Sequence, residues 1–117
     1  MNFVEAISSG FSNYVNFSGR AQRSAYWWWS LFEIVVLVAA QILDGIILGP
    51  GAVALYAISA LVLLLPSIAV GVRRLHDLDR TGWWLLLVFT GIGGILLLIW
   101  FCMKGTTGAN RFGPDPL

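Results

Sequence analysis

The stretch that decides the fold is SAYWWWSLFEIVVLVAAQILDGIILGPGAVALYAISALVLLLPSIAVGV, residues 24–72. It contains two apolar runs, 24–48 and 51–72, joined by a Gly-Pro-Gly turn. Each run reaches the ~20 residues that an α-helix needs to cross ~30 Å of hydrocarbon. Because the turn is so short, we predict a tight antiparallel hairpin of two membrane-spanning helices.

A third apolar run, GWWLLLVFTGIGGILLLIWFCM, occupies residues 82–103 and is also long enough to span. Tryptophans open the first and third runs, and Trp100 closes the third about 25 Å further along a helix. This placement is typical of two aromatic belts at the membrane surfaces. Small residues at 90–94 are interpreted as helix-packing positions, although a glycine cluster also lets a run turn back.

Composition supports the same class. Of the 117 residues, 58% are hydrophobic and only 11% charged, whereas soluble domains carry roughly 25% charged residues. The length allows one domain, 1–117, and the sequence predicts an all-α membrane protein with three transmembrane helices.

Cys102 is the only cysteine and His76 the only histidine, which excludes an internal disulfide and a Cys/His zinc site within one chain. No metal or cofactor is expected, and a net charge of +1 gives no attraction for nucleic acid.

The two ends of the chain differ from the apolar runs. Residues 3–17 place apolar side chains at helical spacing, namely Phe3, Val4, Ile7, Phe11, Tyr14 and Val15. Such a short amphipathic helix is expected either to lie in the membrane interface or to pack against the bundle. Residues 104–117 contain three glycines and two prolines, which predicts a turn-rich tail.

Basic residues predict the orientation. With three spans, one face holds Arg20, Arg23, Arg73, Arg74 and Arg80, and the other holds only Lys104 and Arg111. The positive-inside rule then places the N-terminus in the cytoplasm and the C-terminus outside.

Three polar residues lie inside the first run: Glu33, Gln41 and Asp44. An intramembrane carboxylate is a functional candidate because its burial is costly unless it is paired or hydrated. The alternative is that both acids reach solvent, since each lies towards one end of the run.

The densest polar cluster follows the second run: Arg73, Arg74, His76, Asp77, Asp79 and Arg80. Together with Arg20 and Arg23, its arginines are candidates for binding anionic lipid headgroups. His76, Asp77 and Asp79 are candidates for an ion-pair network. No catalytic residue is assigned, because adjacent residues do not face each other on a helix and no nucleophile completes a catalytic set.

Three motifs resemble a known family: FSGRAQRSAYWWW at 17–29, LLPSIAVGVRRLHDLDRTGWW at 64–84 and GTTGANRFGPDP at 105–116. They are similar to those of the small bacterial inner-membrane proteins of the YhaH/YhaI type, domain-of-unknown-function family 805 (DUF805). Asp79 and Thr81 stand where that family often has Gly and Ser. The resemblance implies a bacterial inner-membrane location and no particular reaction.

These observations favour a non-enzymatic membrane protein that binds anionic lipid through its arginine-rich loop. One alternative is a transport or channel component that uses Glu33 and Asp44 in a homo-oligomer, because three spans cannot enclose a pore alone. The second alternative is an enzyme that acts on lipid headgroups through His76 and Asp77.

Overall fold

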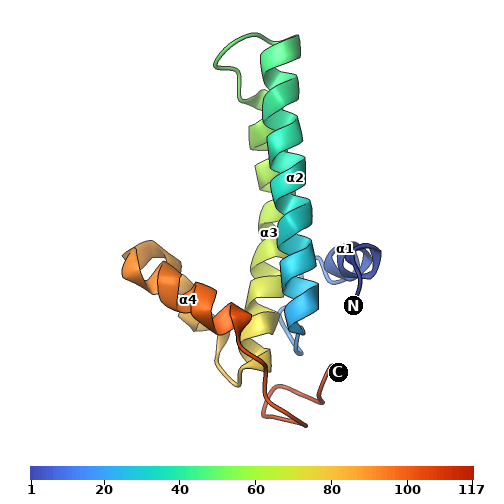
Figure 1. Cartoon of the computed structure of the whole chain (residues 1–117), viewed down its shortest axis with the longest axis vertical. Coiled ribbons are helices and arrows are strands. Elements are labelled where there is room, and N and C mark those ends of the chain that lie inside the picture. Colours follow the sequence, from blue (N-terminus) through green and yellow to red (C-terminus); the bar gives the residue numbers. More distant parts are fainter.

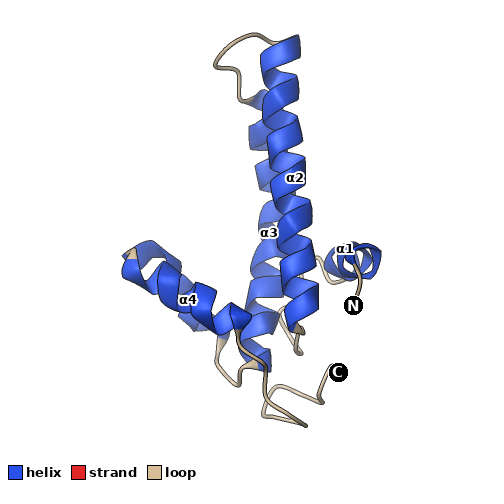
Figure 2. Cartoon of the chain, viewed as in Figure 1, coloured by secondary structure: helices blue, strands red, loops and turns tan.

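A computed structural model describes residues 1–117, which form helices and loops without a β-strand (Figure 2). The all-α class is therefore confirmed. A long antiparallel hairpin of α2 (Arg23–Ile47) and α3 (Ala54–Asp77) forms the axis of the molecule (Figure 1). Both helices are long and apolar enough to cross a membrane. The hairpin predicted from residues 24–72 is thus present.

The third apolar run differs from the prediction. It forms a 3-10 helix, η1 (Gly82–Thr90), and a short α-helix, α4 (Ile92–Cys102), and the chain reverses direction between them. Gly91 makes the break with φ of 72°, a conformation that side chains other than glycine rarely adopt. The Thr90 hydroxyl then accepts a hydrogen bond from the Gly93 N–H at 3.0 Å. One continuous helix over 82–103 was therefore a wrong prediction.

The two arms of this second hairpin are too short to cross. Nine residues of 3-10 helix extend about 18 Å, and eleven residues of α-helix about 16 Å, against ~30 Å of hydrocarbon. The tryptophans at its two ends meet, because the Trp84 and Trp100 rings lie 5.6 Å apart. The predicted assignment of Trp100 to an opposite aromatic belt is accordingly wrong. The third run therefore forms a short helical hairpin and not one helix of spanning length.

The end of α4 returns to the beginning of α2. The Trp27 indole N–H donates to the Phe101 carbonyl at 3.0 Å, and the Tyr26 and Phe101 rings lie 4.3 Å apart. The tail that follows α4 contains no helix and packs below the α2–α3 hairpin, near the N-terminal segment (Figure 1). This differs from the predicted placement of the two termini on opposite faces.

The N-terminal helix α1 (Phe3–Ser12) lies across the lower part of α2. Phe11 meets the rings of Trp29 and Phe32 edge-on, and Trp29 packs so closely on α1 that only a glycine fits at position 10. Of the two placements expected for this segment, the structure has it packed against the helical hairpin.

Candidate functional site at the basic end

All basic side chains gather at one end of the α2–α3 hairpin, which we call the basic end. They come from the segment before α2, the first turn of α2, the last turns of α3, the loop after α3 and the tail. The opposite end, formed by residues 48–53, has no Lys or Arg. The members of the basic end are Arg20, Arg23, Arg73, Arg74, Arg80, Lys104 and Arg111.

Asp77 is the centre of this end. Its Oδ1 lies 3.0 Å from the Arg20 Nη2, and its Oδ2 lies 2.5 Å from the Arg74 Nη1. The three side chains are only 6%, 1% and 0% exposed, respectively. Arg74 and Asp77 are three residues apart in the last turn of α3, so they share a face, and Arg20 reaches them from the segment before α2. The carboxylate compensates two buried guanidinium groups.

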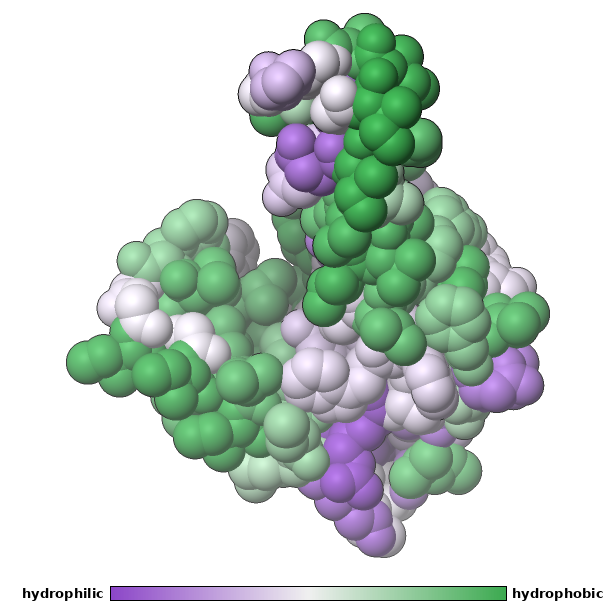
Figure 3. Space-filling view, turned by 45° about the horizontal axis from the view of Figure 1, so that its top comes forward, coloured by the Kyte–Doolittle hydropathy of each residue, from purple (hydrophilic) through white to green (hydrophobic).

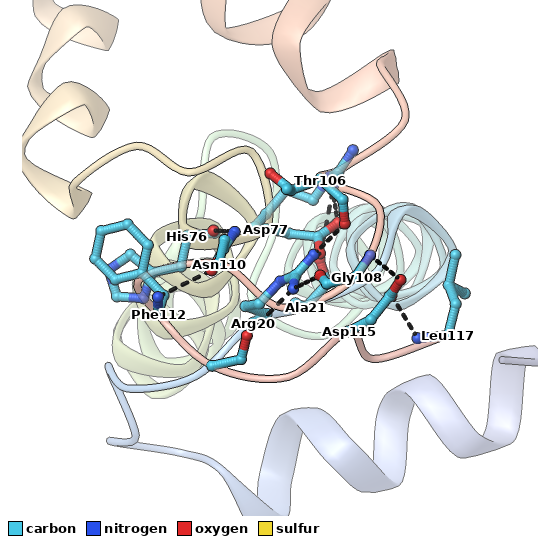
Figure 4. Close-up of polar contacts among 12 residues, drawn as sticks. Arg20, Ala21, His76, Asp77, Thr106, Gly108, Asn110, Phe112, Asp115 and Leu117 are labelled. Carbon is cyan, nitrogen blue, oxygen red and sulfur yellow. Dashed lines mark hydrogen bonds and ion pairs between the residues drawn. The ribbon is translucent and has the colours of Figure 1, made fainter.

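Arg20 also holds the C-terminal tail (Figure 4). Its guanidinium donates hydrogen bonds to the backbone carbonyls of Thr106 at 2.5 Å and Gly108 at 2.6 Å. The Thr106 N–H in turn donates to the Asp77 carbonyl at 2.7 Å. Arg74 donates to the carbonyl of Met103. A carboxylate and main-chain oxygens of the tail thus accept hydrogen bonds from the buried guanidinium groups of Arg20 and Arg74, and of their nitrogens only the Nε of Arg74 is buried without a partner.

The imidazole ring of His76 packs against the tail. Its Nδ1 lies 2.9 Å from the Gly19 carbonyl, and its ring stacks on Phe112 with centroids 4.0 Å apart. The neighbouring Asp77 carboxylate faces a different hollow, lined by tail residues. His76 and Asp77 do not converge on one pocket, and this geometry does not support an acid/base pair.

The other basic residues have varied surroundings. The Arg80 guanidinium lies 4.1 Å above the Trp100 ring, a cation–π contact. Exposed Arg23 donates to the Cys102 carbonyl at 3.1 Å. The Nε and Nη2 of Arg73 are buried without a hydrogen-bond partner. Of the arginines predicted to meet lipid, Arg20 and Arg74 are used inside the protein, whereas Arg23 and Arg80 stay partly accessible.

The tail has its own turn at the surface. Asp115 accepts hydrogen bonds from the N–H groups of Leu117 at 3.0 Å and Gly108 at 2.9 Å. These bonds favour the ionised carboxylate and lower the pKa of Asp115. A second surface contact pairs Arg111 with Asp79 at 3.2 Å.

Asp44 closes the far end of the hairpin. It is fully buried, and its two carboxylate oxygens accept the N–H groups of Leu55 at 2.8 Å and Tyr56 at 3.0 Å. These are unpaired N–H groups of the first turn of α3, so Asp44 on α2 caps the neighbouring helix. Gln41 donates to the Ala52 carbonyl at 3.2 Å. Asp44 and Gln41 thus both hydrogen-bond to the main chain in or next to the turn that joins α2 to α3.

Glu33 faces α3 halfway along the hairpin. The Ser67 hydroxyl donates to its carboxylate at 2.5 Å, and the Trp29 indole N–H donates to the Ser67 hydroxyl oxygen at 3.0 Å. This short chain of hydrogen bonds joins α2 to α3.

Sequence reasoning missed the tail residues that complete the basic end. Thr106, Gly108 and Met103 contribute main-chain carbonyls, and these oxygens are the same for every residue type. Phe112 and Asn110 carry more signal, because an aromatic and an amide stand out in a glycine-rich tail; Asn110 donates to the His76 carbonyl at 2.9 Å.

Comparison with known proteins places the chain in a family. Residues 14–114 match the family model described as "Protein of unknown function (DUF805)". The chain is 45% identical over 105 residues to "Inner membrane protein YhaI" of Escherichia coli (strain K12), covering 89% of this chain and 88% of that protein. It is 42% identical over 108 residues to "Inner membrane protein YhaH" of the same strain, covering 89% of each. No solved structure matches the chain. These relatives and the two spanning-length helices fit an inner-membrane location, and the chain belongs to the DUF805 family.

Proposed function

We propose that this protein is a non-enzymatic component of the bacterial inner membrane that binds anionic phospholipid at its basic end. In this proposal α2 and α3 cross the bilayer, the η1–α4 hairpin enters and leaves from one side, and both termini are cytoplasmic. The observation that carries it is the gathering of all seven Lys and Arg residues at one end of the hairpin.

The charge distribution supports this orientation more strongly than the three-span arrangement does. With three spans, five basic residues would face two across the membrane; with a re-entrant third run, seven face none. The positive-inside rule assigns such an end to the cytoplasm. The proposal therefore replaces the outside location of the C-terminus with a cytoplasmic one.

The same charges support binding to anionic lipid. Acidic residues at the basic end are Glu5, Asp77, Asp79 and Asp115, fewer than the basic ones. Arg23, Lys104 and Arg111 are exposed. Each basic residue near an anionic membrane surface contributes about 1 kcal/mol of attraction.

No specific observation favours the rival functions. Asp44 is engaged as a helix cap and Glu33 is hydrogen-bonded to Ser67, so neither carboxylate supports an ion path. A transport role would still require a homo-oligomer, which is open to measurement. His76 and Asp77 line different hollows, which does not support headgroup chemistry.

Two measurements test the proposal. A reporter that is active only in the cytoplasm is expected to work when fused after Leu117; a reporter active only outside should fail there. The opposite result would reject the cytoplasmic C-terminus.

For lipid, native mass spectrometry from mixed anionic and zwitterionic nanodiscs compares wild type with a variant carrying Arg23→Gln, Lys104→Gln and Arg111→Gln. We expect the variant to lose up to about 3 kcal/mol of preference for anionic lipid. The control carries Thr107→Gln and Ala109→Gln, which replace exposed uncharged tail residues. Equal anionic preference in all three proteins would leave the basic end with a topological role only.

A further inference from the structure

A long groove lies between α3 and η1, with a volume of about 780 Å³. Its wall on α3 is a single stripe of residues four apart, which therefore share one helix face. The stripe extends about 18 Å along α3, from the basic end towards the middle of the hairpin, and consists of His76, Val72, Ile68 and Leu64. Figure 3 shows the hollow between the η1–α4 hairpin and the α2–α3 column, with apolar surface on both sides.

Polar atoms line this groove at one end only. The opposite wall is apolar and includes Leu86, Val88 and Phe89. At the basic end, where α3 finishes and η1 begins, the lining changes to His76 and Thr81. The Thr81 hydroxyl makes no capping hydrogen bond to η1. The Nδ1 of His76 donates to the Gly19 carbonyl at 2.9 Å, so the Thr81 hydroxyl is the hydrogen-bond donor that this mouth offers.

We infer that this groove binds one phospholipid, with an acyl chain along the α3 stripe and the phosphate at Thr81 and His76. The phosphate accepts a hydrogen bond from the Thr81 hydroxyl, and the His76 ring lies beside it. The surplus of basic residues at this end favours the negative charge of the phosphate.

The position of the groove explains why an acyl chain fills it. α3 crosses the bilayer, so a groove along α3 has the same direction as the acyl chains around it. Its apolar walls offer water no hydrogen-bond partners, and an open apolar surface is favourably covered by hydrocarbon. The polar mouth lies at the basic end, next to Trp83, a residue type that favours the headgroup level.

This inference deepens the proposed function by giving one lipid a defined site, and it rests on the membrane placement proposed above. The two proposals require different side chains. The groove holds a lipid through its acyl chain and phosphate, whereas the anionic preference of the basic end depends on exposed Arg and Lys side chains. Retention of one lipid without an anionic preference would overturn the proposed function and support the groove.

The first test uses the unaltered protein in nanodiscs that contain a phosphatidylglycerol with a diazirine in the middle of its acyl chain. After illumination, mass spectrometry of peptides is expected to place crosslinks on the groove stripe and on η1, several-fold above the face of α2 around Val38, which is at least as exposed as the stripe. Crosslinks spread evenly over α2 and α3 would overturn the inference.

The second test fills the groove. Ile68→Trp places a bulky ring in the stripe, and we expect lipid retained in native mass spectrometry to fall about tenfold. The matched control is Leu65→Trp, which adds the same ring to an exposed position of α3 outside the groove. Thr81→Val keeps the side-chain shape and removes the hydroxyl, and should lower retention of phospholipid but not of diacylglycerol. Equal retention by Ile68→Trp and Leu65→Trp would contradict the site.

Discussion

At the scale of single residues, Asp77 decides how the charges at the basic end are tolerated. A buried arginine is costly unless a counter-charge and hydrogen bonds compensate it. Asp77 supplies the counter-charge to both Arg20 and Arg74, while the tail carbonyls of Thr106 and Met103 accept one further hydrogen bond from each guanidinium. Among the arginines predicted to bind lipid, Arg20 and Arg74 are therefore buried and structural, whereas Arg23 is exposed.

We expect Asp77→Asn to destabilise the protein by about 3–5 kcal/mol, because the change leaves two buried cations without a counter-charge. Thermal unfolding in nanodiscs measures the loss. The control is Asp79→Asn in the exposed pair with Arg111, expected to cost less than about 1 kcal/mol. Asn tolerates the positive φ of 59° at position 79, so this control changes only the charge. A small loss for both variants would mean that Asp77 does not compensate the arginines.

At the scale of elements, α1 shows how one glycine determines packing. A Cβ at position 10 would overlap the Trp29 ring, so the approach of α1 to α2 requires glycine there.

We expect Gly10→Ala to release α1 from α2, at a cost of about 1–3 kcal/mol for the steric overlap. Hydrogen exchange of the α1 amides measures the release. Ser8→Ala, on the exposed side of α1, is the control and should leave exchange slow. Unchanged protection in Gly10→Ala would show that α1 is held elsewhere.

The apolar composition of residues 82–103 predicts one spanning helix, whereas the structure has the η1–α4 hairpin there. Its residues are as apolar as those of a span, and the break depends on Gly91 at positive φ with Gly93 closely packed against Thr90 and Leu87.

Replacing Gly91, Gly93 and Gly94 together by Leu should convert the hairpin into one continuous helix, because each substitution favours regular helix over the turn. The C-terminus would then cross the membrane, and a fused cytoplasmic reporter should lose activity. Ile92→Leu with Ile95→Leu is the matched control, since it alters the same segment and keeps the glycines. A reporter that stays active in the triple variant would show that the docked tail, and not the glycines, holds the hairpin re-entrant.

At the scale of the whole molecule, the asymmetry of charge is the main feature. One end of a molecule 51 Å long carries every Lys and Arg, and the other end is closed by Asp44 and Gln41 without any basic residue. Insertion with the basic end in the cytoplasm is therefore favoured over the reverse.

Adding Leu48→Lys and Pro50→Lys to the far turn should weaken this preference, because basic residues then lie at both ends. We expect a fraction of molecules to insert in the reverse orientation, seen as reduced activity of a cytoplasmic C-terminal reporter at equal protein level. Leu48→Gln with Pro50→Gln is the uncharged control. Full activity in both variants would show that features other than charge determine the orientation.

The sequence alone determined the class of the protein and its main hairpin. Partition into lipid depends on the composition of a local run, and the turn at 49–51 leaves few ways to join two such runs, so helices close to 24–48 and 51–72 could be predicted. The α3 helix continues to Asp77, beyond the apolar run, because Arg74 and Asp77 pair within its last turn.

Only the tertiary structure decided the course of the third run and the use of each arginine. An apolar run of 22 residues, 82–103, satisfies the same compositional test whether it crosses or turns back, and the outcome depends on backbone conformation at Gly91 and on where the tail binds. Arg20 contacts Thr106 and Gly108, more than eighty residues away in sequence. Main-chain carbonyls are identical in every residue, so no pattern of side chains marks them as partners before the chain has folded.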